Sequence, residues 1–211
     1  MNGIAVALLA GTGVIAVVDW VAVVTSIRRL EYAAKPGVMV GLIAVALTLR
    51  PISPAERAFF IVALALGLAS DVLLMLPKDM FLAGLVAALV EHIAYIAGFR
   101  ARDLNATLLA IAMVVALVSV ALFLPPIYRA LRGSRPKLVA PVIVYVAVFV
   151  VMVATAGGTG SLVALAGALL FLYSDAILAW NRFVRPIPLG RIVNIVPYHL
   201  GEALLVVSLV T

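Results

Sequence analysis

The chain has no cysteine and few charged side chains. Of its 211 residues, 11% are charged and 66% are hydrophobic, and the mean hydropathy is +1.29. Soluble domains carry about 25% charged residues, so this composition indicates an integral membrane protein. The lack of cysteine excludes disulfides, thiolate metal sites and a cysteine nucleophile. Two histidines, His92 and His199, are too few for a three-histidine zinc site.

Long apolar runs fill most of the sequence. A membrane-spanning helix needs about 20 apolar residues, with a range of about 17 to 25. Eight segments fit or approach this length, of which the second is the shortest: 4–24, 36–50, 58–76, 81–98, 105–124, 138–155, 161–180 and 192–210. The sequence predicts an all-α polytopic membrane bundle of eight transmembrane helices. Because the connections are short, residues 1–211 are expected to form a single integral membrane domain.

The first apolar run, 4–24, has no basic segment before it and contains Asp19. A cleavable signal peptide normally has a basic start and a shorter apolar core. We therefore expect a retained first helix.

Lysine and arginine are distributed unevenly between the connections. Eleven of the 15 lie in the first, third, fifth and seventh connections, and four in the others. The positive-inside rule then predicts that both termini lie outside and that the odd-numbered connections lie in the cytoplasm. The net charge of +6 is interpreted as a topology signal and a source of lipid-phosphate contacts, not as a nucleic-acid site. The Ala- and Val-rich composition favours a bacterial inner (plasma) membrane.

Two short cassettes of the form Ser-Asp-x-aliphatic-Leu place an aspartate inside an apolar helix. They are residues 70–74, with Asp71, and 174–178, with Asp175. A carboxylate at membrane depth costs at least a few kcal/mol, so it is retained where it has a function. The offset of four helices suggests a parallel repeat of four plus four helices with a site between the halves. The alternative is structural: each aspartate accepts hydrogen bonds from neighbouring helices or pairs with Lys35.

Other polar residues converge on the same depth. A rise of about 1.5 Å per residue places Asp71 and Asp175 about 8 to 12 Å inside the cytoplasmic surface. The remaining candidates fall in or near that half of the bundle: Asp19, Lys35, Glu91, His92, Tyr95, Asn194, Tyr198, His199 and Glu202. Residues three or four apart share a helix face, as His92 and Tyr95 do, and as Tyr198 and Glu202 do.

Several of these residues have a simpler interpretation. Lys35 can extend to the membrane surface, as lysines near helix ends commonly do. His92 can be a neutral hydrogen-bond partner between helices. Tyr95 and Tyr198 can be packing residues, and Asp19 can be interfacial.

The cassettes and the residues around them resemble the two signatures of the YhhN-like lysoplasmalogenases. The first signature is similar to residues 70–76 followed by Phe81, Gly84 and His92-x-x-Tyr95, and the second to residues 167–179 followed by Asn181 and Phe183. Lys35-Pro36, and Tyr198 with a polar residue four positions later, fit the remaining family positions. The chain departs from the pattern at Glu202, where the family favours glutamine, and at Glu91, where a small or apolar residue is usual.

The resemblance implies an alkenyl ether hydrolase. Such an enzyme hydrolyses the vinyl-ether bond of a lysoplasmalogen, a lysophospholipid within the membrane, to a fatty aldehyde and a glycerophospho-base. Asp71 and Asp175 would share the acid and base tasks, as paired carboxyls do in glycosidases. Lys35 would hold the lipid phosphate, and the other substrate-binding candidates are Asp19, His92, Tyr95, Asn181, Tyr198 and Glu202. No metal and no cofactor are expected.

Three alternatives stay open at this point. Buried Asp and His also describe proton-coupled small-molecule transporters. The chain can also be an inactive lipid-binding membrane protein, or a hydrolase of another lipid bond. Its small residues permit helix contacts within one chain as well as between chains, so the sequence specifies no oligomeric state.

Overall fold

A computed structural model describes residues 1–211, and helices make up nearly all of it. The eight long helices are α1 (Gly3–Thr25), α2 (Arg28–Thr48), α3 (Pro54–Met75), α4 (Phe81–Phe99), α5 (Ala106–Ser134), α6 (Val139–Gly158), α7 (Leu162–Ala179) and α8 (Gly190–Ser208). A short 3₁₀ helix, η1 (Pro136–Leu138), precedes α6, and a π-helical segment, η2 (Trp180–Val184), follows α7. The all-α fold with eight long helices is confirmed.

The odd-numbered helices begin with a side-chain cap. Asn2, Ser53, Asn105 and Ser161 each accept a hydrogen bond from a backbone N–H three residues later, at the starts of α1, α3, α5 and α7. Such caps satisfy one of the N–H groups that have no partner within the helix. The even-numbered helices begin at the other end of the bundle, and none of them has a side-chain cap.

Seven of the eight helices are long and apolar enough to cross a membrane. The exception is α8, because Asn194, His199 and Glu202 make it less apolar than the others. It nevertheless packs closely along α7: a Cβ atom on Gly167 would lie 2.9 Å from the carbonyl oxygen of Gly201. Small residues at such positions allow two helix backbones to approach. The polytopic bundle is confirmed, and a membrane crossing by α8 stays a prediction.

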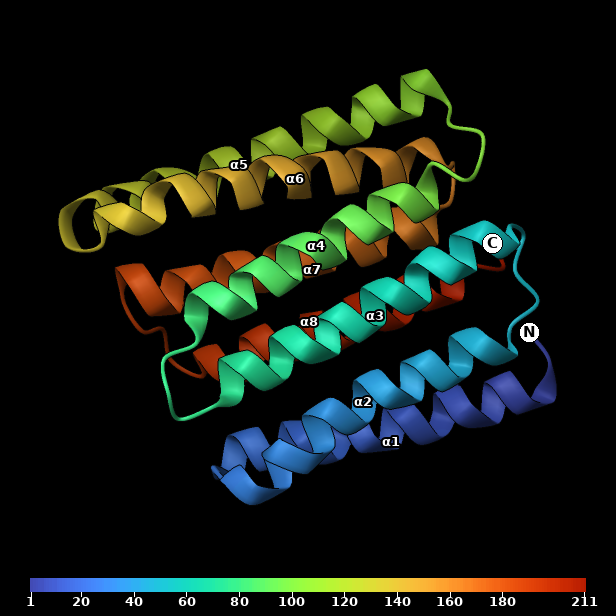
Figure 1. The fold of residues 1–211 in the computed structure, drawn as a ribbon, viewed down its shortest axis with the longest axis horizontal. Helices are drawn as coiled ribbons and strands as arrows, with labels where there is room; N and C mark the ends of the chain where they lie inside the picture. The colour runs from blue at the N-terminus through green and yellow to red at the C-terminus, as the bar shows by residue number, and fades with distance from the viewer.

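Consecutive helices form antiparallel hairpins (Figure 1). The α3–α4 and α7–α8 hairpins form the centre, the α1–α2 hairpin packs on one side of them and the α5–α6 hairpin on the other. Both termini lie at the same end of the bundle. We call the opposite end the basic end, because 11 of the 15 Lys and Arg residues lie in or near it. Its connections are residues 26–27, 76–80, 135–138 and 180–189. The parallel repeat stays a prediction.

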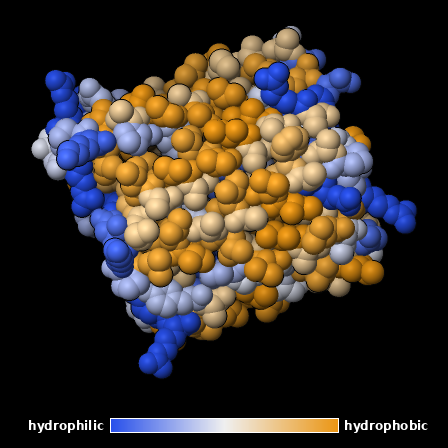
Figure 2. All heavy atoms as spheres, viewed as in Figure 1, coloured by the Kyte–Doolittle hydropathy of each residue, from blue (hydrophilic) through white to orange (hydrophobic).

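The outer surface carries an apolar band. Figure 2 shows hydrophobic side chains across the middle of the molecule and hydrophilic side chains at its two ends. Large apolar side chains in the middle turns of α1 and α5 are exposed, including Val14, Val118 and Leu122, which is 69% exposed. In water such a surface would be unstable, whereas lipid chains solvate it. The chain is therefore an integral membrane protein.

Candidate active site

A cavity of about 680 Å³ lies between the α3–α4 and α7–α8 hairpins. Of the 39 residues that line it, 24 are hydrophobic. At the basic end its wall includes Arg28, Phe81, Phe183 and Arg191, and at mid-depth it includes Phe149. The size and the mostly apolar lining are typical of sites for small hydrophobic molecules.

Asp71 on α3 has a partner for each carboxylate oxygen. Lys35 Nζ lies 2.6 Å from its Oδ1, and the Tyr198 hydroxyl donates a hydrogen bond of 2.8 Å to its Oδ2. The Lys35 side chain is 14% exposed and that of Asp71 is 6% exposed. Lys35 also lies 5.4 Å from the centre of the Tyr198 ring. A cation from α2 and a hydroxyl from α8 therefore hold this carboxylate.

Asp175 on α7 has different partners. The Tyr145 hydroxyl from α6 donates to its Oδ2, and His92 Nε2 from α4 lies 2.8 Å from that hydroxyl oxygen. His92 Nε2 is 3.9 Å from Asp175 Oδ2, and no lysine or arginine lies within 4 Å of this carboxyl group. The Asp175 side chain is 18% exposed. Unlike Asp71, it has no permanent cation beside it.

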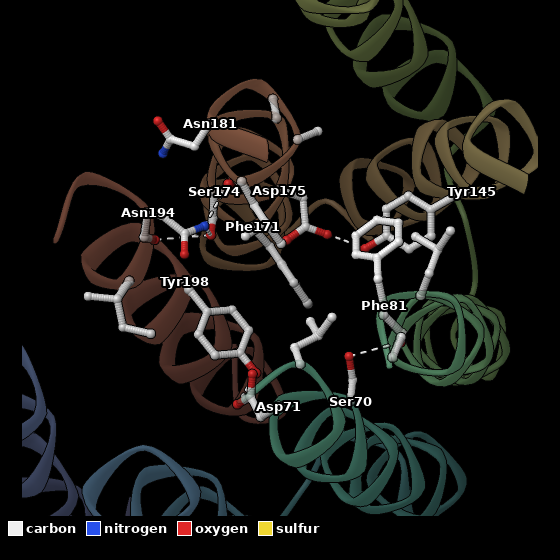
Figure 3. Close-up of a pocket in the computed structure, with 18 of the residues that line it drawn as sticks. Ser70, Asp71, Phe81, Tyr145, Phe171, Ser174, Asp175, Asn181, Asn194 and Tyr198 are labelled. Carbon is white, nitrogen blue, oxygen red and sulfur yellow. Dashed lines mark hydrogen bonds between the residues drawn. The ribbon is translucent and has the colours of Figure 1, made fainter. Parts of the chain in front are cut away.

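The serine of each cassette fastens its helix to the other helix of the same hairpin. Ser70 Oγ donates to the carbonyl oxygen of Gly84 on α4 at 3.0 Å. Ser174 Oγ donates to the carbonyl oxygen of Asn194 on α8, also at 3.0 Å, and the Asn194 amide donates back to the Ser174 carbonyl oxygen at 2.8 Å. Figure 3 shows Ser70 next to Asp71, and Ser174 with Asn194 next to Asp175. Each aspartate therefore follows a residue that sets the position of its helix.

Five of the nine sequence-predicted site residues line the cavity: Lys35, Asp71, Asp175, Asn181 and Tyr198. Asn181 lies in the π-helical segment, where its Oδ1 accepts a 3.0 Å hydrogen bond from the Ile187 N–H. It also packs against Gly190, since a Cβ atom there would meet the Asn181 side chain. In this geometry Asn181 holds the connection between α7 and α8.

The other four predicted residues lie behind the cavity wall: Asp19, His92, Tyr95 and Glu202. Asp19 is fully buried on α1, with its Oδ2 4.0 Å from His199 Nε2. The Tyr95 hydroxyl on α4 donates to Glu202 Oε2 on α8 at 2.5 Å. His92 reaches Asp175 through Tyr145. These positions support roles that act through neighbouring side chains rather than direct contact with a ligand.

Among the remaining lining residues, Tyr145 and Glu91 are buried polar side chains outside the set of nine. Tyr145 is the only tyrosine in the apolar segment 138–155. This single tyrosine hydroxyl in an apolar segment was the sequence signal that could have identified Tyr145 as a site residue. Glu91 lines the mid-depth wall, and a Cβ atom on Gly67 would collide with its Oε1. Gly67 thus leaves the space that this buried carboxyl group occupies. No group of three or more His, Asp and Glu side chains is arranged to hold a metal ion.

Residues 30–209 match the YhhN family. The chain belongs to this family. Among curated proteins, this YhhN-family chain is 32% identical over 151 residues to the lysoplasmalogenase TMEM86B of Sus scrofa, covering 69% of the chain and 61% of that protein. It is 29% identical to the human and mouse proteins of the same name, with the same coverage. The chain thus spans about three fifths of the length of these relatives. No solved structure matches it.

Proposed function

We propose that this YhhN-family protein hydrolyses the vinyl-ether bond of a lysoplasmalogen, releasing a fatty aldehyde and a glycerophospho-base. The observation that carries the proposal is the pair of aspartates, Asp71 and Asp175, on the walls of one largely apolar cavity (Figure 3). Their surroundings differ, since each accepts a hydrogen bond from a tyrosine but only Asp71 has a lysine beside it. The names of the relatives point to the same activity.

The cavity suits a lipid with one chain. Its apolar part accommodates an alkenyl chain, and its wall at the basic end includes cationic side chains for a phosphate. Lys35, which the sequence suggested for the phosphate, is engaged with Asp71. We therefore assign the phosphate to Arg28 and Arg191, which line the cavity and are exposed. Arg191 lies 2.5 Å from Glu31 Oε1, so this interaction would be exchanged for the phosphate.

The two aspartates are assigned different roles by their partners. Lys35 provides the positive charge that a carboxylate needs in a buried site, so Asp71 acts as the ionised group. Asp175 has no such cation, and its Oδ1 makes no hydrogen bond within the protein, so this oxygen can carry the acidic proton into the cavity. Different surroundings for two carboxyl groups are what separates acid from base in hydrolases.

The reaction then proceeds in balanced steps. Asp175 gives its proton to the β-carbon of the vinyl ether, the vinyl carbon that is not bonded to oxygen. The α-carbon, which is bonded to the ether oxygen, then shares the positive charge of an oxocarbenium ion with that oxygen. The Asp71 carboxylate stabilises this cation. Water adds to the α-carbon and returns a proton to Asp175. The resulting hemiacetal breaks its C–O bond to the glycerol, and its hydroxyl proton passes to the departing oxygen.

The residues behind the wall have positioning roles in this proposal. His92 holds the Tyr145 hydroxyl, and Tyr145 orients Asp175. Tyr95 and Glu202 join α4 to α8, which keeps the two hairpins at a constant separation around the cavity. Asp19 neighbours His199, to whose Nδ1 the Trp20 indole donates at 3.1 Å. Through His199, Asp19 contributes to the position of α8.

A direct test measures fatty aldehyde released by the purified protein from choline- and ethanolamine-type lysoplasmalogens. An alkyl-ether lysolipid is the matched substrate control, because it has no carbon–carbon double bond to protonate. Asp71→Asn and Asp175→Asn should each abolish release, and Asp103→Asn should not, since Asp103 is exposed in the connection between α4 and α5. Full activity in both cavity variants, or no aldehyde from the parent chain, contradicts the proposal.

The same measurement separates the enzyme from a transporter. A carrier built on helices broken near the membrane midplane would place its site at the breaks. Here α1 to α8 are each continuous, and the π-helical segment lies at the end of α7. Accumulation of a solute in proteoliposomes without any covalent change would favour a transporter instead.

A further inference from the structure

Phe81 and Phe183 come from opposite hairpins and meet at the wall of the cavity. Phe81 is the first residue of α4, and Phe183 lies in the π-helical segment after α7. Their rings pack edge to face, with centres 5.3 Å apart and planes at 84°. Both rings line the cavity at the basic end. The contact therefore forms part of the cavity wall at that end of the bundle.

Arg182 and Asp79 hold this contact from outside. The Arg182 guanidinium lies 4.2 Å from the centre of the Phe81 ring, and its Nη2 donates to Asp79 Oδ1 at 2.8 Å. The same Asp79 oxygen accepts the Phe81 N–H at 3.3 Å, and Arg135 Nη1 lies 4.0 Å from Oδ2. One carboxylate thus joins the start of α4 to the end of α7 and to the end of α5.

These ionic contacts are weak enough to be released. The Asp79 side chain is 64% exposed and that of Arg182 is 32% exposed. Solvent screens such pairs, so each shifts the equilibrium between the joined and parted positions of the two rings by at most about fivefold. On the Phe183 side the backbone bonding changes to the wider π pattern, in which the Arg185 N–H reaches the Trp180 carbonyl oxygen at 3.2 Å. Segments of this kind often mark functional sites.

We propose that the Phe81–Phe183 contact is a gate that parts to admit a single-chain lipid, with the Asp79–Arg182 pair as its latch. The two rings are apolar on the cavity side, where a hydrocarbon chain would pass. The latch is polar and faces the water, where a head group would remain. The nature of the passing molecule rests on the proposed function, whereas the opening itself does not.

The first experiment locks the gate. In a Phe81→Cys/Phe183→Cys double variant, a reducible bis-methanethiosulfonate with a short spacer bridges only these two positions, because the chain has no other cysteine. Aldehyde release should fall at least tenfold after bridging and return when the bridge is reduced. The two single variants, treated with the same reagent, form no bridge and control for its bulk. Equal rates in the bridged and reduced protein would overturn the gate.

The second experiment needs no enzymatic activity. Ala88 lines the cavity and is 9% exposed, so an Ala88→Cys variant reports access by its rate of labelling with an alkyl-chain maleimide. Adding Asp79→Asn should raise that rate up to about fivefold, and adding Asp103→Asn should leave it unchanged. An unchanged rate with Asp79→Asn would overturn the latch. If the parent chain releases no aldehyde while the latch effect is present, the gate stands and the proposed reaction fails.

Discussion

The Tyr145 hydroxyl on α6 donates a hydrogen bond to Asp175 on α7, and His92 on α4 lies within hydrogen-bond distance of the same hydroxyl. Tyr145 and Asp175 are thirty positions apart in the chain. Nothing in the second cassette itself points to Tyr145. The orientation of the proposed proton donor therefore depends on a helix that carries no signature of its own.

Tyr145→Phe should lower the turnover number of aldehyde release about tenfold to a hundredfold. The variant leaves the ring in place but removes the hydroxyl that orients Asp175 and donates to the carboxylate formed when Asp175 gives up its proton. Hydrogen bonds to charged groups contribute about 1.5–3 kcal/mol. Steady-state kinetics checks this, with KM expected to change less than turnover. Tyr173→Phe is the matched control, because its hydroxyl bonds to Ser119 on α5, away from both aspartates. Equal turnover in Tyr145→Phe and the parent chain would remove Tyr145 from the mechanism.

Lys35→Met should destabilise the fold as well as the activity. It leaves Asp71 as a buried carboxylate without its cation, and breaking a buried ion pair on one side costs about 3–5 kcal/mol. The double variant Lys35→Met/Asp71→Asn should recover much of the stability, since the orphaned charge is gone, but should release no aldehyde. Thermal unfolding in detergent measures the first effect. If the single and double variants unfold alike, Lys35 is not the counter-ion of Asp71.

Gly201→Ala should separate α8 from α7. A Cβ atom at Gly201 would lie 3.0 Å from the Gly167 carbonyl oxygen and from the Phe171 nitrogen, both backbone atoms that cannot turn aside. Overpacking of this kind costs about 1–3 kcal/mol. We expect a lower unfolding temperature and reduced aldehyde release. Gly13→Ala, where nothing lies within 4 Å of the added atom, should have neither effect.

The basic end should face the cytoplasm if the positive-inside rule holds for this chain. Single cysteines test this, because the parent sequence has none. Ala101→Cys lies in the connection between α4 and α5 at the end that holds the termini, and Ser134→Cys lies at the basic end; both positions are exposed. In intact cells a membrane-impermeant maleimide should label only Ala101→Cys, and both after permeabilisation. The reverse pattern would place the termini inside.

The ratio of the Ala88→Cys labelling rates with and without Asp79→Asn should fall towards one as salt rises and stay constant between pH 5 and 8. The ratio is used because maleimide reacts with the thiolate, so each rate by itself rises with pH. The Phe81 N–H and the Arg182 guanidinium hold the pKa of Asp79 below its ordinary value of 3.8. A lowered pKa means that the latch is intact above this value and is lost only as the pH falls through it. The facing groups, Arg182 and Arg135, stay charged throughout this range. A ratio that changes with pH within this window, or that does not respond to ionic strength, would show that the Asp79–Arg182 pair does not control access.

The number and approximate positions of the helices were predictable because they follow from composition. Apolar runs of about 20 residues specify spans wherever they occur, and connections rich in Pro, Gly and Arg separate them. The apolarity of α8 was overestimated. It carries the polar residues that the bundle interior needs, and a helix that faces other helices rather than lipid does not need to be uniformly apolar.

The candidate site was predictable where a polar residue interrupts an apolar helix. Asp71, Asp175, Lys35 and Tyr198 stand out for that reason, and all four line one cavity. Tyr95 and Glu202 stand out in the same way, yet they pair with each other behind the wall. Spacing along a helix shows which residues share a face, but not which neighbour that face meets.

The sequence by itself determined that the chain is a helical membrane protein with an aspartate inside an apolar helix in each of two similar cassettes, because hydropathy and the cost of a charge in lipid are local properties. Only the tertiary structure decided that Lys35 pairs with Asp71 while Tyr145 serves Asp175, and that Phe81 meets Phe183. These pairs join different helix hairpins. Their formation depends on how the hairpins pack, and close packing of side chains is a property of the whole bundle.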